Sequence, residues 1–224
     1  LKKYAAPTSW PITRKDTVYI TKPSAGPHNL RRSMSIELIL RILGYAKTKR
    51  EIKKILTTNE ILVDGRRIKE PSFPVGIFDT ITFKTLKQNH RIVFDNQGKL
   101  SLLPIKEEEA KTKITKINGK KIQNKGVLQL NLSDGRNILT KEKNYAVGDT
   151  LVIETPSNKI QKHLKLEQGA MIYLIDGKHV ADTGTVKTIE KTTITYTSTT
   201  NKHVQTLKQY AYVIGKDKPV ITLK

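Results

Sequence analysis

The stretch AKTKREIKKILTTNEILVDGRRIKEPSFPVGIFDTI, residues 46–81, places a short amphipathic segment directly before a hairpin signature. Thr48 is followed three residues later by Glu51, a capping-box pattern that predicts the start of a helix. Asp64-Gly65 then separates two apolar runs, as in a two-residue hairpin turn. The stretch therefore predicts a helix, a hairpin and a further strand within PSFPVGIFDTITF.

The positive charge of this stretch is placed on one side. On a helical wheel Ile52, Ile55 and Leu56 fall on one face, which is expected to face a core. The basic residues of the helix fall on the opposite face, and two more follow the turn. Together with the residue before the helix, the cations of this region that are expected to bind an anionic partner are Lys47, Lys49, Arg50, Lys53, Lys54, Arg66 and Arg67.

A first helix is expected just before this stretch. Ser35 or Ser33 can cap it, and it is expected to run to about Leu43, with Gly44 ending it. Two short helices followed by strands predict a small α+β unit.

Residues 1–33 lack sustained periodicity and contain four prolines, so they are expected to form an irregular arm. Such a segment needs a neighbouring surface or a ligand to become ordered. Its candidate residues for binding a phosphate-rich ligand are Lys2, Lys3, His28, Arg31 and Arg32. The imidazole of His28 can stack on a base or bond a phosphate, or it can be satisfied by local backbone.

The remainder of the chain alternates short apolar runs with turn dipeptides. Hairpins are predicted around residues 96–98, Asn118-Gly119 and Asp134-Gly135. Residues 106–113 are expected to form a short charged connector or a helical turn on a solvated surface. Residues 166–224 carry a second series of about five short strands, typical of a small barrel. The expected fold class is α+β and mostly β, with two barrel-like domains.

The 224 residues carry 41 Lys and Arg against 20 Asp and Glu, a net charge of +21. Such an excess indicates a polyanionic partner, because neutralising phosphates releases counterions. A membrane surface is the other candidate, but no segment shows an aromatic and leucine-rich face opposite a basic one. No apolar run approaches the roughly 20 residues of a membrane span, so no membrane partner is expected.

Signals for catalysis are lacking. The sequence has no cysteine, and its five histidines stand singly, so no metal site, cofactor or thiol nucleophile is expected. It contains no phosphate-binding P-loop, no G-x-G-x-x-G, no G-x-S-x-G and no His-Glu-x-x-His. We therefore expect neither enzymatic activity nor a small-molecule substrate, and the lack of cysteine fits a reducing, cytoplasmic environment.

Residues 46–81 resemble the S-four RNA-binding domain, on the segments TKREIKKIL, ILVDGRRIKEPS and VGIFDTI. That family has two short helices, the second basic, then a hairpin followed by basic residues. The resemblance implies that the second helix and the start of the hairpin contact RNA backbone.

The resemblance extends over essentially the whole chain to the archaeal and eukaryotic "e" family of small-subunit ribosomal protein four, closer to the archaeal type. It rests on AAPTSW at 5–10, GPHNLR at 26–31, LGYAKT at 43–48, VDG at 63–65, FPVGIFD at 73–79 and YAYVIGKDKP at 210–219. It implies an arm (1–33), an S-four domain (34–86), a central β domain (87–165) and a KOW-type, SH3-like domain (166–224). Asp182 and Thr183 depart from the family, which usually has basic residues there.

The function implied is that of a structural constituent of the small ribosomal subunit, supporting subunit assembly and translation. The expected partners are small-subunit ribosomal RNA and neighbouring ribosomal proteins, with the chain present as a monomer within cytoplasmic ribosomes. Two alternatives remain open: an RNA-modifying enzyme with an S-four domain, and a KOW-type transcription elongation factor. The first lacks a catalytic Asp in a recognisable setting, and the second leaves the basic helix and the arm unexplained.

Overall fold

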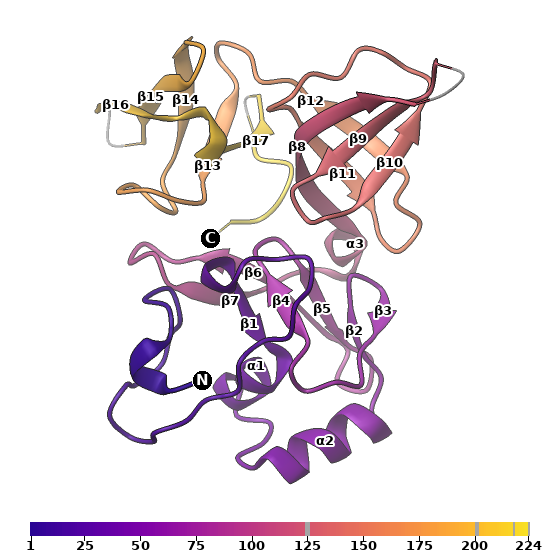
Figure 1. Ribbon diagram of the computed structural model, residues 1–224, viewed down its shortest axis with the longest axis vertical. Coiled ribbons are helices and arrows are strands. Elements are labelled where there is room, and N and C mark those ends of the chain that lie inside the picture. Colours follow the sequence, from indigo (N-terminus) through magenta and orange to yellow (C-terminus); the bar gives the residue numbers. More distant parts are fainter. Residues whose placement is uncertain (124–125, 200–201, 217, 224) are drawn as a thin grey trace. The chain divides into compact units, whose positions relative to one another are not determined.

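The computed structural model describes residues 1–123, 126–199, 202–216 and 218–223, and it divides into two compact units (Figure 1). Unit 1 spans Leu1–Lys111 and unit 2 spans Thr112–Lys224. Strands outnumber helices in both, so the expectation of a mostly β fold with an α+β first unit is confirmed. No helix of the described chain combines the length and the apolar character needed to cross a membrane.

Unit 1 contains the arm, three short α-helices and seven strands. Its main sheet has the order β3-β2-β5-β6-β7, and a separate pair joins β1 to β4. The bounds are β1 Ser33–Ser35, α1 Ile36–Ile42, α2 Lys49–Thr58, β2 Ile61–Val63, β3 Arg66–Arg67, β4 Pro74–Gly76, β5 Thr80–Phe83, β6 Gln88–Phe94, β7 Leu100–Pro104 and α3 Glu107–Ala110.

Helix α1 begins where capping chemistry predicts. The Ser35 hydroxyl accepts a hydrogen bond from the Leu38 amide at the start of α1, and Gly44 follows the helix with a φ of 75°. A left-handed residue after the last turn is a common helix stop, and glycine adopts it without strain. The helical prediction for residues 36–43 is therefore confirmed to within one residue.

The main sheet extends beyond the predicted boundary between residues 86 and 87. β6 pairs antiparallel with β5, and β7 pairs with β6, so both continue the sheet of the helical domain. The side chain of Arg91 on β6 is fully buried and forms an ion pair with Glu109 of α3. The helical turn expected as one possibility for residues 106–113 is present as α3. Its expected solvated role differs, since α3 packs against this part of the sheet and supplies the carboxylate that the buried guanidinium needs.

Unit 2 begins with a five-stranded arrangement in the order β10-β9-β8-β11-β12. Its strands are β8 Thr112–Ile122, β9 Leu128–Leu132, β10 Asn137–Thr140, β11 Thr150–Glu154 and β12 Ile160–Leu164. Ile117, Leu130, Leu151 and Ile153 are almost fully buried in its core. The hairpin predicted at Asp134-Gly135 lies between β9 and β10, as expected.

The hairpin predicted at Asn118-Gly119 is wrong. β8 runs through both residues, and the register shifts between Ile117 and Gly119 in its pairing with β9. The first half of β8 pairs with β11 and the second half with β9. Asn-Gly here marks a bulge at the point where one long strand changes partners, and a bulge favours the same small, turn-forming residues as a turn.

The second part of unit 2 is a sheet in the order β16-β15-β14-β13-β17. Its strands are β13 Met171–Leu174, β14 Thr183–Ile189, β15 Thr193–Ser198, β16 His203–Leu207 and β17 Ala211–Gly215. Lys116 of β8, almost fully buried, donates to the carbonyls of Lys208 and Ala211 at 2.7 and 2.8 Å. These bonds join the two β parts within one compact unit. The sequence predicted them as two domains with a boundary after residue 165.

Candidate nucleic-acid interface

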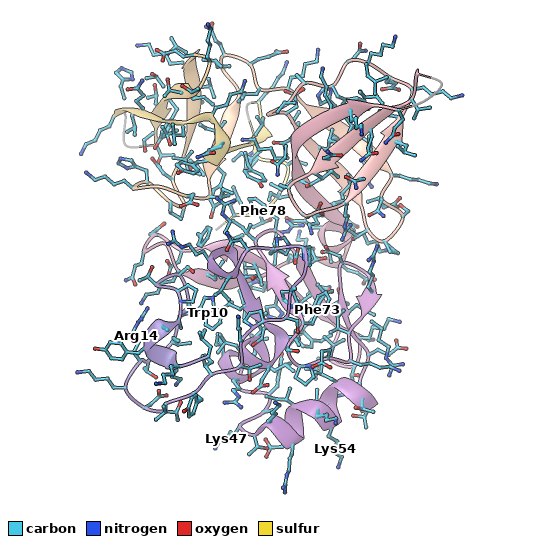
Figure 2. All side chains as sticks on the ribbon, in the orientation of Figure 1. Trp10, Arg14, Lys47, Lys54, Phe73 and Phe78 are labelled. Carbon is cyan, nitrogen blue, oxygen red and sulfur yellow. The ribbon has the colours of Figure 1, made fainter. Side chains whose placement is uncertain are left out.

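Helix α2 carries the densest group of basic side chains in unit 1. Ile52 and Leu56 of α2 are fully buried and Ile55 is half-buried, so the apolar face packs as predicted. Lys49, Arg50, Lys53 and Lys54 are all exposed. Figure 2 shows Lys54 projecting from the helix away from the rest of unit 1.

The capping box fixes the first turn of α2. The Thr48 hydroxyl accepts from the Glu51 amide, and the Glu51 carboxylate accepts from the amides of Lys47 and Thr48 at 2.9 and 3.2 Å. These backbone donors lower the pKa of Glu51 below its ordinary value of 4.5. The cap therefore stabilises the helix above that pH and weakens as the pH falls through the lowered pKa. Glu51 is the one acidic residue of the helix, and its carboxylate is engaged at the N-terminus.

We expect Thr48→Ala to destabilise unit 1 by about 1 kcal/mol, the usual cost of losing an N-cap hydroxyl. Urea unfolding followed by far-UV circular dichroism measures the loss. Thr57→Ala is the matched control, because the exposed Thr57 hydroxyl only bonds back to the Lys53 carbonyl. An equal loss in both variants would show that the cap has no special role.

The β2–β3 hairpin places two arginines beside the end of α2. Asp64 and Gly65 have φ values of 49° and 75°, the left-handed pair that a type I′ turn requires. Arg66 and Arg67 follow the turn and are exposed, and Arg67 donates to the Thr57 carbonyl of α2 at 3.1 Å. This bond brings the hairpin next to the C-terminal turn of the helix, a contact that the sequence did not predict.

We call the exposed cations of this surface the basic strip, which comprises Lys47, Lys49, Arg50, Lys53, Lys54, Arg66 and Arg67. Within the described chain, none of the seven forms an ion pair. The acidic residues near the strip in sequence are engaged by other groups. Glu51 caps α2, Glu60 pairs with Lys84, and Asp64 accepts from the Thr80 amide. The charge of the strip is thus available to an external anion.

The arm is ordered by packing on the rest of unit 1. Trp10, labelled in Figure 2, belongs to the arm. It is 2% exposed, and its indole N–H donates to the Ser33 carbonyl at 2.8 Å. The Ser9 carbonyl accepts from the Leu100 amide at 2.7 Å, and Ser24 is bonded to Ser72. The arm is therefore ordered by a neighbouring surface, as one of the two expected possibilities: it binds the sheet and the β4 region of its own chain.

Two predicted RNA-binding residues of the arm have internal roles instead. The ammonium of Lys3 is paired with Asp16, and the residue is 8% exposed. The imidazole of His28 is 7% exposed and bonded to Asp79 at 2.9 Å. Burial removes both side chains from a backbone-binding surface, so we leave them out of the interface. Lys2 and Arg31 are exposed, and Arg32 is half-buried.

His28 is held in place by a close approach to Gly76. A Cβ at Gly76 would lie 2.2 Å from the ring carbon Cγ of His28. The Asp79 carboxylate also accepts from the Gly76 amide at 2.8 Å, so arm, β4 and the following turn share one cluster. A side chain at position 76 has no room unless His28 leaves.

We expect Gly76→Ala to destabilise unit 1 by about 1–3 kcal/mol, the usual cost of overpacking, and to release residues 24–30 of the arm. Hydrogen exchange of the Ser24 amide, which donates to Ser72, reports this release. Adding His28→Ala restores the missing space, so the double variant should regain part of the lost stability. A double variant less stable than Gly76→Ala alone would contradict this account.

No other chemistry is evident at the interface. In the described part of the chain, no group of three or more His, Asp or Glu residues is arranged to hold a metal ion. What the basic strip offers is a row of flexible ammonium groups and forked guanidinium donors, which suit phosphate oxygens.

Three family models match the chain in sequence. The RS4NT domain matches residues 1–31, the S4 domain residues 35–81 and ribosomal family S4e residues 86–160. The match of the S4 domain covers α1, α2 and the β2–β3 hairpin, and thus the whole basic strip.

Curated relatives match from end to end. The small ribosomal subunit protein eS4 of Methanosphaera stadtmanae is 39% identical over 229 residues, covering 100% of this chain and 95% of the relative. The protein of the same name from Methanocaldococcus jannaschii is 37% identical over 237 residues, covering 100% and 96%.

A solved structure agrees with the fold. The crystal structure of the 30S ribosomal protein S4e from Thermoplasma acidophilum superposes with a TM-score of 0.70 at 29% identity, covering 83% of this chain and 95% of that one. Sequence and fold agree over most of the length, and the chain belongs to the ribosomal S4e family.

Proposed function

We propose that this chain is a structural RNA-binding component of the small ribosomal subunit, and that its basic strip binds ribosomal RNA. The relatives that match it over 95% or more of their length are named small ribosomal subunit proteins. The choice of surface rests on the seven exposed cations of the basic strip, none of which forms an ion pair among the described residues.

The strip would bind backbone phosphates rather than read bases. Its members are point charges and guanidinium forks, and contacts of this kind position a protein without reading sequence. The deep major groove of A-form RNA is closed to side chains, so duplex RNA is recognised by shape and by its phosphates. The helix and the adjoining hairpin offer two surfaces that can straddle one stretch of backbone, with Lys2, Arg31 and Arg32 of the arm as further contacts.

The proposed partners are small-subunit ribosomal RNA and neighbouring ribosomal proteins, with one copy of the chain in each cytoplasmic subunit. Family membership supports a role that is not enzymatic. An RNA-modifying enzyme or an elongation factor is less favoured, because the match to ribosomal relatives covers the whole chain and not the S4 domain alone.

Sedimentation through a sucrose gradient, followed by crosslinking to RNA, tests the proposal. We expect the chain to sediment with the small subunit and to crosslink to its RNA at residues 49–54. Sedimentation with RNA polymerase would favour an elongation factor. Turnover of a uridine or a methyl donor by the purified chain would favour an enzyme, and either result would overturn the proposal.

A further inference from the structure

A pocket of about 340 Å³ lies in unit 1 between the arm and helix α1. Its volume is near the lower end of the roughly 300–1,000 Å³ typical of small-molecule pockets, which leaves room for one long side chain. Asp16 and Tyr19 line it from the arm, and Glu37, Leu38, Arg41 and Ile42 line it from α1. None of the basic-strip residues contributes to this lining.

The charges around the pocket balance, in contrast to the rest of this strongly basic chain. Lys3 pairs with Asp16, and Arg41 pairs with Glu37 at 2.7 Å. A site whose charges cancel attracts RNA phosphates less than the basic strip of the same unit does. The pocket therefore lacks the surplus of positive charge that binding to RNA requires.

Glu37 has an unused hydrogen-bonding atom. Its side chain is 3% exposed, and Oε1 accepts from the Arg41 guanidinium. Its other oxygen, Oε2, is buried and has no hydrogen-bond partner among the described residues. A buried carboxylate oxygen without a donor is costly, so an added donor would be stabilising. The Arg41 side chain is 42% exposed, and exposed side chains change rotamer readily.

Exposed apolar side chains surround the pocket. Tyr19 is 69% exposed and Ile42 is 42% exposed, and both line it; Val18 next to Tyr19 is 65% exposed. An aromatic ring at the mouth can stack on a guanidinium, and aliphatic lining can bury a side-chain stem. The combination of acceptor, ring and aliphatic lining matches the parts of an arginine.

We propose that this pocket receives an arginine side chain from a neighbouring protein. The guanidinium would donate to Glu37 Oε2 and stack on Tyr19, while its stem would pack on Leu38 and Ile42. That the neighbour is a ribosomal protein rests on the proposed function. The affinity of the pocket for an arginine side chain is independent of that function. Unit 1 would then bind RNA through the basic strip and protein through this pocket.

The chemistry is tested by titrating the full chain with N-acetyl-arginine methylamide, followed by amide NMR spectra. We expect saturable shifts at Thr13, Thr17 and Ile42. The citrulline analogue has nearly the same shape without the charge, and we expect at least tenfold weaker binding. Glu37→Gln and Tyr19→Ala should each weaken arginine binding several-fold, and Tyr4→Ala, an exposed tyrosine outside the pocket, should not. Equal binding of both probes, or no localised shifts, would overturn the proposal.

The occupant is tested by photocrosslinking in assembled small subunits. A benzoylphenylalanine at Tyr19 should yield an adduct with a ribosomal protein at a peptide that contains an arginine, and Glu37→Gln should reduce its yield. An RNA adduct, or no adduct, would overturn the proposal. The same photoreactive residue at Lys53 should label RNA, so failure of the proposed function would appear separately, as loss of this second adduct.

Discussion

Replacing Lys49, Arg50, Lys53 and Lys54 together by Gln is expected to weaken binding to small-subunit RNA by about 10²–10³-fold at 0.1 M salt. Each neutralised phosphate contact contributes roughly 0.7–0.9 to the slope of log affinity against log salt concentration. Losing four should flatten that slope by about 3. Filter binding or fluorescence anisotropy at several salt concentrations measures both quantities. Gln is a good helix former, so α2 is expected to remain folded.

A second set of four substitutions separates the strip from charge in general. Lys141, Lys143, Lys191 and Lys202 are exposed in unit 2 and lie outside the predicted interface. Changing them to Gln lowers the net charge by the same amount. We expect at most a tenfold loss of affinity from this control. Equal losses in the two variants would mean that total charge, rather than the basic strip, determines binding.

Trp10→Ala is expected to destabilise unit 1 by about 3–5 kcal/mol. The indole is 2% exposed, so its removal leaves a cavity where the arm meets the sheet. It also leaves the Ser33 carbonyl without its side-chain donor, next to the β1–β4 pair. Urea unfolding monitored by circular dichroism measures the effect. Tryptophan fluorescence cannot be used, because Trp10 is the only tryptophan and the substitution removes it.

Trp10→Phe provides the matched comparison. It keeps an aromatic ring in the site but removes the N–H donor, so we expect a smaller loss than for alanine. In Trp10→Ala, the Leu100 amide, which donates to Ser9, should also exchange faster with solvent because the arm has detached. A change below 1 kcal/mol in Trp10→Ala would show that the arm is held mainly by its other bonds.

The local features of the S4 region could be predicted because their causes lie within a few residues. The capping box at Thr48 and Glu51, the apolar face of α2 and the turn at Asp64-Gly65 all depend on short spacings. The structure confirms each of them. Asn118-Gly119 forms a bulge rather than the expected turn. The two structures require similar residues, and only the pairing of β8 with two partners tells them apart.

The candidate interface was predictable in part. The seven cations of the strip were all named from sequence, and each is exposed. Two arm residues were misplaced, since nothing near Lys3 or His28 in sequence reveals that Asp16 and Asp79 become their partners. The pocket with the unpartnered oxygen of Glu37 had no sequence signal at all.

The sequence by itself determined the charge of the protein, the positions of its helices and most of its turns, and its resemblance to the S4e family. These properties follow from composition and from interactions between residues close in the chain. Only the tertiary structure decided which cations remain free, how far the first sheet extends, and how the arm is anchored. Those outcomes depend on partners distant in sequence, such as Arg91 with Glu109 and Trp10 with Ser33, which only the folded chain brings together.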